Sequence, residues 1–267
     1  MIHPTAIVSP GAQLGQNIDI GPYSIIEEGV QIGDGCSIGP HVLIRTGVEM
    51  GSGNIVHAGA VLGDAPQDLR YRGESTRLII GNQNIFREHV TLHRSNKVSE
   101  PTRIGSNNFL MANSHIGHNS ELGNNIIIAN GALIGGHCVI HDRVFISGNC
   151  LVHQFARIGT MALMQGGSAI SKDLAPYAVA RGANKMSGIN TVGLRRAGLD
   201  SATRLEIRKL YHFLFRSGAT MQKAVSAARV MFPTPACIVL LDFIESSKRG
   251  ICPEARRQKR SSQEDED

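Results

Sequence analysis

The sequence of 267 residues contains no tryptophan, and aromatic residues make up only 4% of it. Aromatic side chains fill much of the volume of most protein cores, so their scarcity argues against a wide interior and favours a narrow one. The sequence also lacks any nucleic-acid-binding motif, and its formal net charge of +5 is modest. We therefore expect no nucleic-acid partner.

Cysteine is scarce and unpaired in this chain. There are five cysteines, an odd number, and none has the spacing of a disulfide framework or of a metal-ligand pair. This usage argues against a disulfide-bonded secreted protein and indicates buried, reduced thiols, which are typical of the cytoplasm. The cysteines are Cys36, Cys138, Cys150, Cys237 and Cys252.

Long apolar runs are also missing. The longest, around residues 126–128, is far too short to cross a membrane. No basic and apolar leader precedes the first repeat, which begins at Ile2. We therefore expect no transmembrane segment, no signal peptide and a cytoplasmic location.

The dominant feature of the sequence is an apolar residue at every sixth position. The series covers residues 2–62, 80–92 and 104–170, and the gaps between these stretches are themselves multiples of six. A small or β-branched residue usually follows four places after the apolar one. Neither an α-helix nor an ordinary strand has this period. The pattern is the hexapeptide repeat, and it predicts a mainly β protein: a left-handed parallel β-helix with three short strands in each coil.

The repeat predicts a β-helix over residues 1–176, interrupted by polar loops at about 63–77 and 93–102. Loops on a rigid scaffold often carry binding residues, so both loops are candidates for a site. The charged residues 254–267 are expected to form a disordered tail.

Residues 177–253 are expected to form a C-terminal α-helical domain that caps the open end of the β-helix. We predict that Asp200 or Ser201 caps a first helix that runs to about Arg216, and that a second helix covers residues 221–232. A Thr-Pro pair predicts the start of a third helix at Thr234, which would run to about Lys248.

Histidines and glycines gather on three neighbouring coils of the predicted β-helix. Three hexads make an 18-residue coil, so residues 18 apart lie above one another at roughly 4.8 Å, the spacing between strands. This places His118 beside Gly136, Gly136 beside Gln154, and Gly135 beside His153. A neutral imidazole can take a proton from a hydroxyl near pH 7, and a backbone N–H can stabilise an oxyanion. The cluster therefore predicts acyl transfer to an alcohol, without a serine or cysteine nucleophile.

Two other interpretations of the cluster stay open at this point. Three histidines on neighbouring coils can bind zinc, as in the carbonic anhydrases built on this repeat. No carboxylate is placed to support such ligands, so we expect no metal. Alternatively, the chain is a non-catalytic solenoid scaffold, which predicts no coincidence of histidines, a Gly-Gly pair and polar loops on one face.

Six segments, in this order, carry a family resemblance. They are Pro66–Tyr71, His93–Arg94, Ser114–Asn119, Gly135–His137, Val152–Phe155 and Gly188–Arg196. Together with the hexads and the helical part, they make nearly the whole chain similar to the UDP-N-acetylglucosamine acyltransferases of lipid A biosynthesis. The later N-acyltransferase of the same pathway carries an added domain before its hexads, whereas the hexads here begin at residue 2.

The resemblance implies a homotrimer with active sites between subunits. It implies transfer of a 3-hydroxyacyl chain from acyl carrier protein to the 3-position of a UDP-linked amino sugar, and it leaves open whether the acceptor atom is a hydroxyl or an amine. No cofactor is implied beyond the phosphopantetheine that the donor carries. The basic surface that includes Arg195, Arg204, Arg208 and Lys209 would receive the acidic carrier protein.

The resemblance also implies roles for single residues. His118 would be the general base, and the N–H of Gly136 would hold the oxyanion. Asn190 and Arg196 would hold the nucleotide end of the acceptor. The other residues implied to contact the acceptor or the donor, or to line the same cleft, are Gln67, Asp68, Arg70, His93, His115, His137, His153 and Gln154.

Two positions depart from the family pattern, and a third bears on the length of the acyl chain. Asn119 follows His118 where many relatives have an aspartate, and an amide orients an imidazole without stabilising the imidazolium as a carboxylate does. Val192 stands where some relatives carry a glutamate near the nucleotide. Gly166 aligns with the position that sets acyl-chain length, and its lack of a side chain predicts a long acyl chain.

Overall fold

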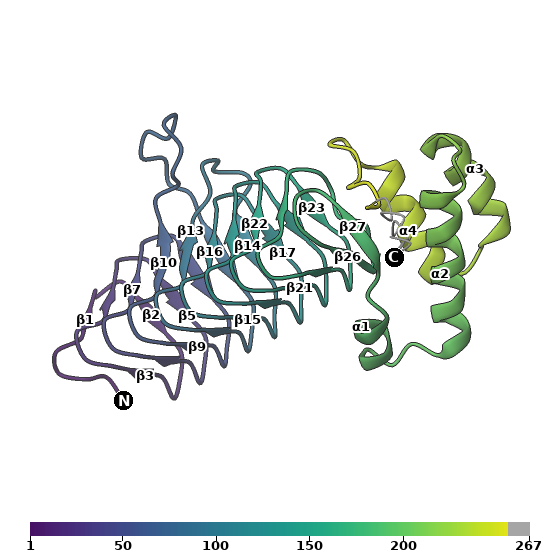
Figure 1. Cartoon of the computed structure of the whole chain (residues 1–267). Coiled ribbons are helices and arrows are strands. Elements are labelled where there is room, and N and C mark those ends of the chain that lie inside the picture. Colours follow the sequence, from purple (N-terminus) through teal and green to yellow (C-terminus); the bar gives the residue numbers. More distant parts are fainter. Residues whose placement is uncertain (256–267) are drawn as a thin grey trace, which may run out of the picture.

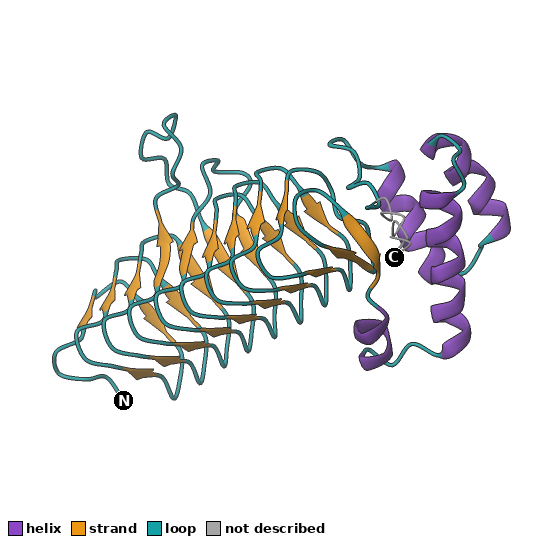
Figure 2. Ribbon diagram, in the orientation of Figure 1, coloured by secondary structure: helices purple, strands orange, loops and turns teal. Residues whose placement is uncertain are grey.

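The structure of the protein is a computed structural model that describes residues 1–255. It is a left-handed parallel β-helix with a group of α-helices at its C-terminal end (Figures 1 and 2). The fold class predicted from the hexads is confirmed. The tail predicted at 254–267 lies outside the described residues, apart from Glu254 and Ala255.

Short strands form the three faces of a triangular prism. The nine-stranded sheet consists of β1 (Ile7–Val8), β4 (Ile25–Ile26), β7 (Leu43–Ile44), β10 (Val61–Asp64), β13 (Thr91–His93), β16 (His115–Ile116), β19 (Leu133–Ile134), β22 (Leu151–Val152) and β25 (Ala169–Ile170). The eight-stranded sheet consists of β2 (Gln13–Leu14), β5 (Gln31–Ile32), β8 (Val48–Met50), β11 (Leu78–Ile80), β14 (Thr102–Ile104), β17 (Glu121–Leu122), β20 (Val139–Ile140) and β23 (Arg157–Ile158).

The ten-stranded sheet completes the prism. It consists of β3 (Asp19–Ile20), β6 (Ser37–Ile38), β9 (Ile55–Val56), β12 (Ile85–Phe86), β15 (Phe109–Leu110), β18 (Ile127–Ile128), β21 (Phe145–Ile146), β24 (Leu163–Met164), β26 (Ala178–Ala180) and β27 (Met186–Ile189). All pairs are parallel except β26 with β27. In the two-residue strands beyond the first coil the second residue is buried and the first faces outward, which accounts for the period of six.

Stacking follows the 18-residue rule where no loop intervenes. Leu133 pairs with Leu151, and His115 pairs with Leu133. The two interruptions project as loops between β10 and β11 and between β13 and β14 (Figure 1). These loops lie beside the turns that join the nine-stranded and eight-stranded sheets, so they overhang one edge of the prism.

Four helices follow the last strand: α1 (Thr191–Arg196), α2 (Ser201–Arg216), α3 (Met221–Met231) and α4 (Pro235–Glu245). The prediction of α2 is confirmed, including its cap, since the Asp200 side chain accepts a hydrogen bond from the Thr203 N–H. The helix α3 ends one residue before the predicted Phe232, and α4 ends three residues before the predicted Lys248.

The segment between residues 177 and 200 differs from its predicted helical character. Here β26 extends the ten-stranded sheet by pairing with β24, and β27 returns as an antiparallel neighbour before α1 begins. The small side chains of Ala178 and Ala180 are fully buried, so this segment continues the β-helix although it no longer follows the hexad.

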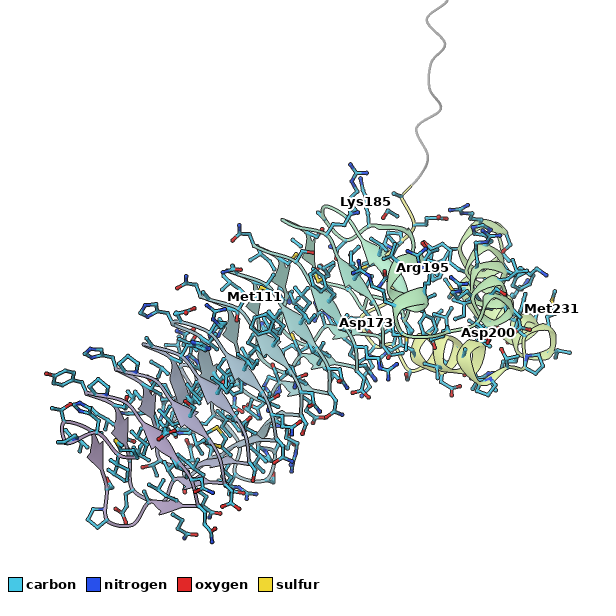
Figure 3. The ribbon with its side chains drawn as sticks, turned by 90° about the horizontal axis from the view of Figure 1, so that it is seen from below. Met111, Asp173, Lys185, Arg195, Asp200 and Met231 are labelled. Carbon is cyan, nitrogen blue, oxygen red and sulfur yellow. The ribbon has the colours of Figure 1, made fainter. Side chains whose placement is uncertain are left out.

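A buried ion pair joins the helices to the end of the β-helix. Asp173, whose side chain is 1% exposed, accepts hydrogen bonds from the backbone N–H and the Nε of Arg157, both at 2.9 Å. The Arg157 guanidinium also donates to the Phe243 carbonyl at 2.8 Å and lies over the Phe243 ring. Asp173 therefore lies at the junction between the β-helix and the helices (Figure 3).

Two predictions from composition can be compared with the fold. All five cysteines are buried and unpaired, as predicted. Among residues 1–255, no helix has the length and apolar character needed to cross a membrane.

Candidate active site

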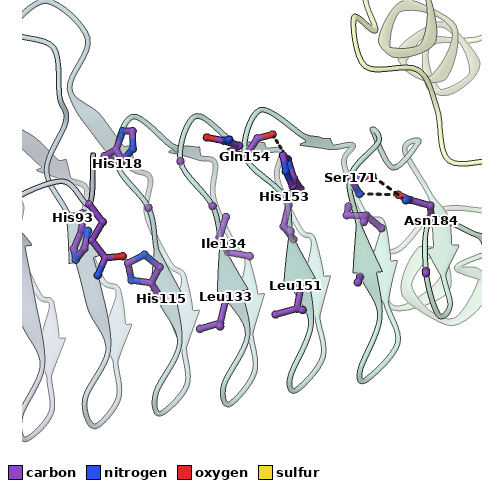
Figure 4. A pocket seen from close by; sticks show the side chains of 18 residues that line it. His93, His115, His118, Leu133, Ile134, Leu151, His153, Gln154, Ser171 and Asn184 are labelled. Carbon is purple, nitrogen blue, oxygen red and sulfur yellow. Dashed lines mark hydrogen bonds between the residues drawn. The ribbon is translucent and has the colours of Figure 1, made fainter. Parts of the chain in front are cut away.

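A groove of about 620 Å³ runs across several coils at the edge where the nine-stranded and eight-stranded sheets meet (Figure 4). Seven of the predicted site residues line it: Gln67, His93, His115, His118, Gly136, His153 and Gln154. The apolar side chains of Leu133 and Leu151 lie on the strands, farther from the turns (Figure 4). The groove thus combines a polar rim of imidazoles with an apolar floor.

The turn after β16 holds His118 in one orientation. The Nδ1 of His118 lies 2.8 Å from the Oδ1 of Asn119, which cannot donate a hydrogen bond. In the neutral ring, Nδ1 therefore carries the proton and Nε2 keeps its lone pair. Nε2 lies close to the next coil, because a Cβ built on Gly136 would lie 2.9 Å from it.

Glycines allow the coils to approach closely at this point. A Cβ on Gly117 would lie 2.6 Å from the Gly136 nitrogen, and one on Gly135 would lie 2.7 Å from the Gln154 nitrogen. The Gly136 carbonyl accepts a hydrogen bond from the Phe155 N–H at 3.0 Å, whereas the Gly136 N–H has no partner among the described residues. This N–H is thus a free donor close to His118.

Two imidazoles, buried His93 and half-buried His115, lie at the N-terminal end of the groove. The rings of His93 and His115 meet edge to face with centroids 4.7 Å apart, and the Nδ1 of His115 lies 2.7 Å from the Thr91 hydroxyl. Burial lowers the pKa of His115 from the usual 6.5 to about 4, and it also lowers the pKa of His93. Both rings are therefore neutral near pH 7.

His93 also carries an unused polar atom. Its side chain is 8% exposed, and its Nδ1 has no hydrogen-bond partner among the described residues. A buried polar atom without a partner is costly, so it suits a position that a substrate group completes.

A second groove, of about 370 Å³, lies on the other side of His118. It contains three more predicted site residues, Asp68, Arg70 and His137. The His137 ring stacks on Phe155 with centroids 4.7 Å apart and meets the His118 ring edge to face at 5.1 Å. The pair of His118 and His137 therefore separates the two grooves.

Charged and amide groups of the two loops organise this second groove. Arg70 donates to both oxygens of Asp68, at 3.2 and 3.0 Å, and Asn96 donates to Asp68 at 2.7 Å. These bonds, those from Arg70 first, hold the pKa of Asp68 well below its usual value, so the carboxylate is charged. Lys97 lines the same groove and adds a cation.

The structure does not bring Asn190 or Arg196 to either groove of the chain. Asn190 is the N-cap of α1: its Oδ1 accepts from the Gly193 N–H, and its Nδ2 donates to the Met161 carbonyl. Arg196 is exposed in the last turn of α1. Both residues follow the end of the ten-stranded sheet.

Several lining residues were not predicted from the sequence. Leu133 and Leu151 occupy the outward position of their hexads, and apolar residues 18 apart at that position were a signal for the floor of the groove. Ser171 and Asn184 close the C-terminal end, where Asn184 accepts from the Ser171 N–H at 2.7 Å (Figure 4). Nothing in the local sequence marks this pair. Within residues 1–255, no group of three or more His, Cys, Asp or Glu side chains is placed to hold a metal ion.

Comparison with known proteins gives two family matches. The family described as Udp N-acetylglucosamine O-acyltransferase, Domain 2, matches residues 173–252. The bacterial transferase hexapeptide family matches residues 20–46, 29–64 and 101–136.

Similar proteins cover almost the whole chain. Named relatives include the acyl carrier protein-dependent UDP-N-acetylglucosamine O-acyltransferases of Syntrophobacter fumaroxidans, 43% identical, and of Myxococcus xanthus, 44% identical. Each match spans 94% of this chain and 98% of the relative. The solved UDP-N-acetylglucosamine acyltransferase of Francisella novicida superimposes with a TM-score of 0.93 at 33% identity, covering 96% of this chain and 95% of that one. The enzyme of Bacteroides fragilis gives 0.90 at 36% identity, with 94% and 99% covered.

Proposed function

Because this chain belongs to the family of acyl carrier protein-dependent UDP-N-acetylglucosamine O-acyltransferases, we propose that His118 is its general base and the Gly136 N–H its oxyanion donor. The enzyme transfers an acyl chain from acyl carrier protein to UDP-N-acetylglucosamine, the first step of lipid A biosynthesis. The observation that carries the assignment is the contact of His118 Nδ1 with Asn119 Oδ1, which leaves Nε2 as the acceptor atom of the neutral ring, close to Gly136 on the next coil.

The reaction follows from these two groups. His118 Nε2 takes the proton of the sugar 3-hydroxyl while the oxygen attacks the thioester carbonyl of the 3-hydroxyacyl donor. The C–O bond forms, and the negative charge moves to the former carbonyl oxygen, which the Gly136 N–H binds. When the C–S bond breaks, the departing thiolate takes the proton back from the imidazolium. The only prosthetic group involved is the phosphopantetheine of the donor, so the enzyme itself needs no cofactor.

The two grooves suit the two substrates. The apolar floor at Leu133 and Leu151 suits the acyl chain of the donor. The charged groove at Asp68, Arg70 and Lys97 suits the sugar nucleotide, since its cations can pair with phosphate oxygens and its carboxylate can accept from sugar hydroxyls. His118 lies between them, where acceptor hydroxyl and thioester would meet.

A homotrimer is proposed from the outward positions of the three sheets. Two faces are largely apolar: Ile7, Ile25, Leu43 and Val61 on the nine-stranded sheet, and Ile55, Ile85, Phe109, Ile127, Phe145 and Leu163 on the ten-stranded sheet, which begins with the polar Asp19 and Ser37. The third face is largely polar, with Gln13, Gln31, Glu49, Arg103, Glu121 and Arg157. Packing the ten-stranded face of one copy on the nine-stranded face of the next covers both apolar faces and closes a ring.

This packing would also complete the site. The helix α1 follows the last strand of the ten-stranded sheet, so it would approach the groove on the nine-stranded sheet of the neighbouring copy. Asn190 and Arg196 would then reach the nucleotide end of an acceptor bound to that copy. The exposed Arg208 and Lys209 of α2 would receive the acidic carrier protein, mainly raising its rate of association. Buried, unpaired thiols support a cytoplasmic location for these steps.

An acyl-transfer assay with product mass as the readout tests the proposal. Purified protein is incubated with UDP-N-acetylglucosamine and a series of 3-hydroxyacyl carrier proteins. A UDP-sugar that gains one hydroxyacyl mass supports donor, acceptor and chemistry together. If product forms only with the 3-amino analogue of the acceptor, the attacking atom is nitrogen and not oxygen. If no product forms with either acceptor, the proposal is wrong.

A further inference from the structure

The residue after the proposed base, Asn119, has every polar atom of its side chain hydrogen-bonded. Its Oδ1 accepts from His118 Nδ1 at 2.8 Å and from the Asn96 N–H at 3.0 Å. Its Nδ2 donates to Ser95 Oγ at 2.6 Å and to the Glu100 carbonyl at 3.1 Å. The side chain is buried, and the backbone has φ 58°, which asparagine tolerates better than most residues.

These partners leave the amide only one orientation. The Asn96 N–H can only donate, and the Glu100 carbonyl can only accept. A flipped amide would set NH₂ against N–H and oxygen against oxygen. The Oδ1 of Asn119 must therefore face His118, which fixes the proton on His118 Nδ1.

The hydrogen bonds of the Ser95 hydroxyl also fix the direction of its proton. Ser95 is fully buried, and its Oγ donates to the Lys97 carbonyl at 3.0 Å. The same Oγ accepts from the Lys97 N–H at 2.9 Å and from Asn119. A hydroxyl has one proton, and here the Lys97 carbonyl takes it. Ser95 thus presents a lone pair, not a proton, to residue 119.

We propose that the loop between β13 and β14 is a holder for a neutral amide, meaning that its hydrogen bonds accept the amide of Asn119 and exclude a carboxylate at that position. Ser95 and Asn119 are positioning residues that fix His118 as a base with a free Nε2. The proposal rests on the role of His118 given above. A carboxylate at this position would place its second oxygen about 3 Å from the Glu100 carbonyl oxygen, where like partial charges repel. The chain thus orients its base by geometry alone, without a neighbouring negative charge.

The central variant is Asn119→Asp. We expect kcat to fall on the order of tenfold or more, because the carboxylate loses two acceptors as partners and the base loses its fixed position. In whatever fraction is active, the negative charge raises the pKa of His118, so the acid limb of kcat/KM moves to higher pH. A purely structural role would not move that limb. Asn125→Asp is the matched control, since Asn125 has a similar φ of 57° but is exposed. This variant should keep the kcat of the wild type and the acid limb of its kcat/KM profile.

Ser95→Ala tests the holder itself. Removing one of the two acceptors of Asn119 Nδ2 should lower kcat on the order of tenfold. The matched control is Ser114→Ala, because Ser114 is equally buried but its hydroxyl has no partner among the described residues; it should keep wild-type kcat. In an Asn119→Ala background, Ser95→Ala should cause no further loss, since both act through one hydrogen bond.

Failure of this inference is distinguishable from failure of the proposed function. If the wild type transfers no acyl group, the function itself is wrong. If the wild type is active but Asn119→Asp is equally or more active, with an unmoved acid limb, the holder is wrong. A readout that needs no variant is the ring ¹⁵N chemical shifts of His118 by solid-state NMR. A protonated Nδ1 and a bare Nε2 support the proposal, and a protonated Nε2 in the neutral ring overturns it.

Discussion

The Nε2 atom of His118 lies close to the backbone of Gly136 on the next coil, and a methyl group on Gly136 would lie 2.9 Å from it. The two residues are 18 apart, so the repeat itself brings them together. The proposed base and a free N–H thus lie beside the same small space. The absence of a side chain at residue 136 keeps that space open for the reacting atoms.

Gly136→Ala keeps the N–H but places a methyl group against His118, so it should lower kcat by about 10²-fold, the cost of a small misplacement of a catalytic group. The backbone of Gly136 is outside the left-handed region, so alanine suits its φ, and the effect comes from the contact with His118. We expect KM to change much less than kcat, because the displaced imidazole acts in the transition state. Steady-state kinetics with a thermal midpoint check this, and an unchanged kcat would contradict the role of Gly136.

His118→Ala should lower turnover by about 10²–10⁴ while the protein stays folded, because general-base catalysis is lost but the coil is held by its backbone. The matched control is His3→Ala, an exposed histidine in the first coil. Both variants should keep the circular dichroism and thermal midpoint of the wild type. If His118→Ala retains more than a small fraction of activity, another group is the base.

Burial of His115 predicts a dependence of stability on pH. Its pKa falls from 6.5 to about 4 on folding, so between these values the unfolded chain binds more protons than the folded one. Stability is fully present above pH 6.5 and decreases as pH falls toward 4, by on the order of 1–3 kcal/mol for this residue. Burial lowers the pKa values of His93 and His137 in the same direction.

Replacing His115 by glutamine removes this titration and keeps a polar side chain beside Thr91. Thermal midpoints measured from pH 7.5 to pH 4.5 should therefore fall less steeply for His115→Gln than for the wild type. Parallel slopes for the two proteins would show that His115 does not couple folding to protonation.

The period of six was enough to predict the fold and the central contacts of the site. It fixes which residues stack, and so it placed His118 beside Gly136 and Gly136 beside Gln154 without any structure. The α2 helix was equally clear, because Asp200 is a cap and the apolar spacing behind it is regular.

The loops and the chain after Pro176 could not be predicted in this way. The hexad repeat does not determine the conformation of a loop. The hydrogen bond between Asp68 and Asn96, which joins the two loops, could therefore not be predicted from it. The separate second groove follows from that contact. The strands β26 and β27 are short and pair with distant partners, and Asn190 serves as a helix cap that no period marks. The direction of the Asn119 amide depends on four neighbours from the second loop and the turn after β16, which are brought together only in the folded chain.

The two apolar faces give the last prediction, on assembly. Phe109 faces outward on the ten-stranded sheet, and a glutamate there would bury a charge if this face packs against a neighbouring copy. Phe109→Glu should therefore convert the proposed trimer to monomer in light scattering and abolish activity, because each site would lose the α1 helix of its neighbour. Gln31→Glu is the matched control: it adds the same charge at the same outward position of the polar, eight-stranded face, and should leave mass and activity unchanged. A Phe109→Glu protein that is still trimeric would mean that the ten-stranded face is not buried, and a monomer with full activity would mean that Asn190 and Arg196 act outside the site.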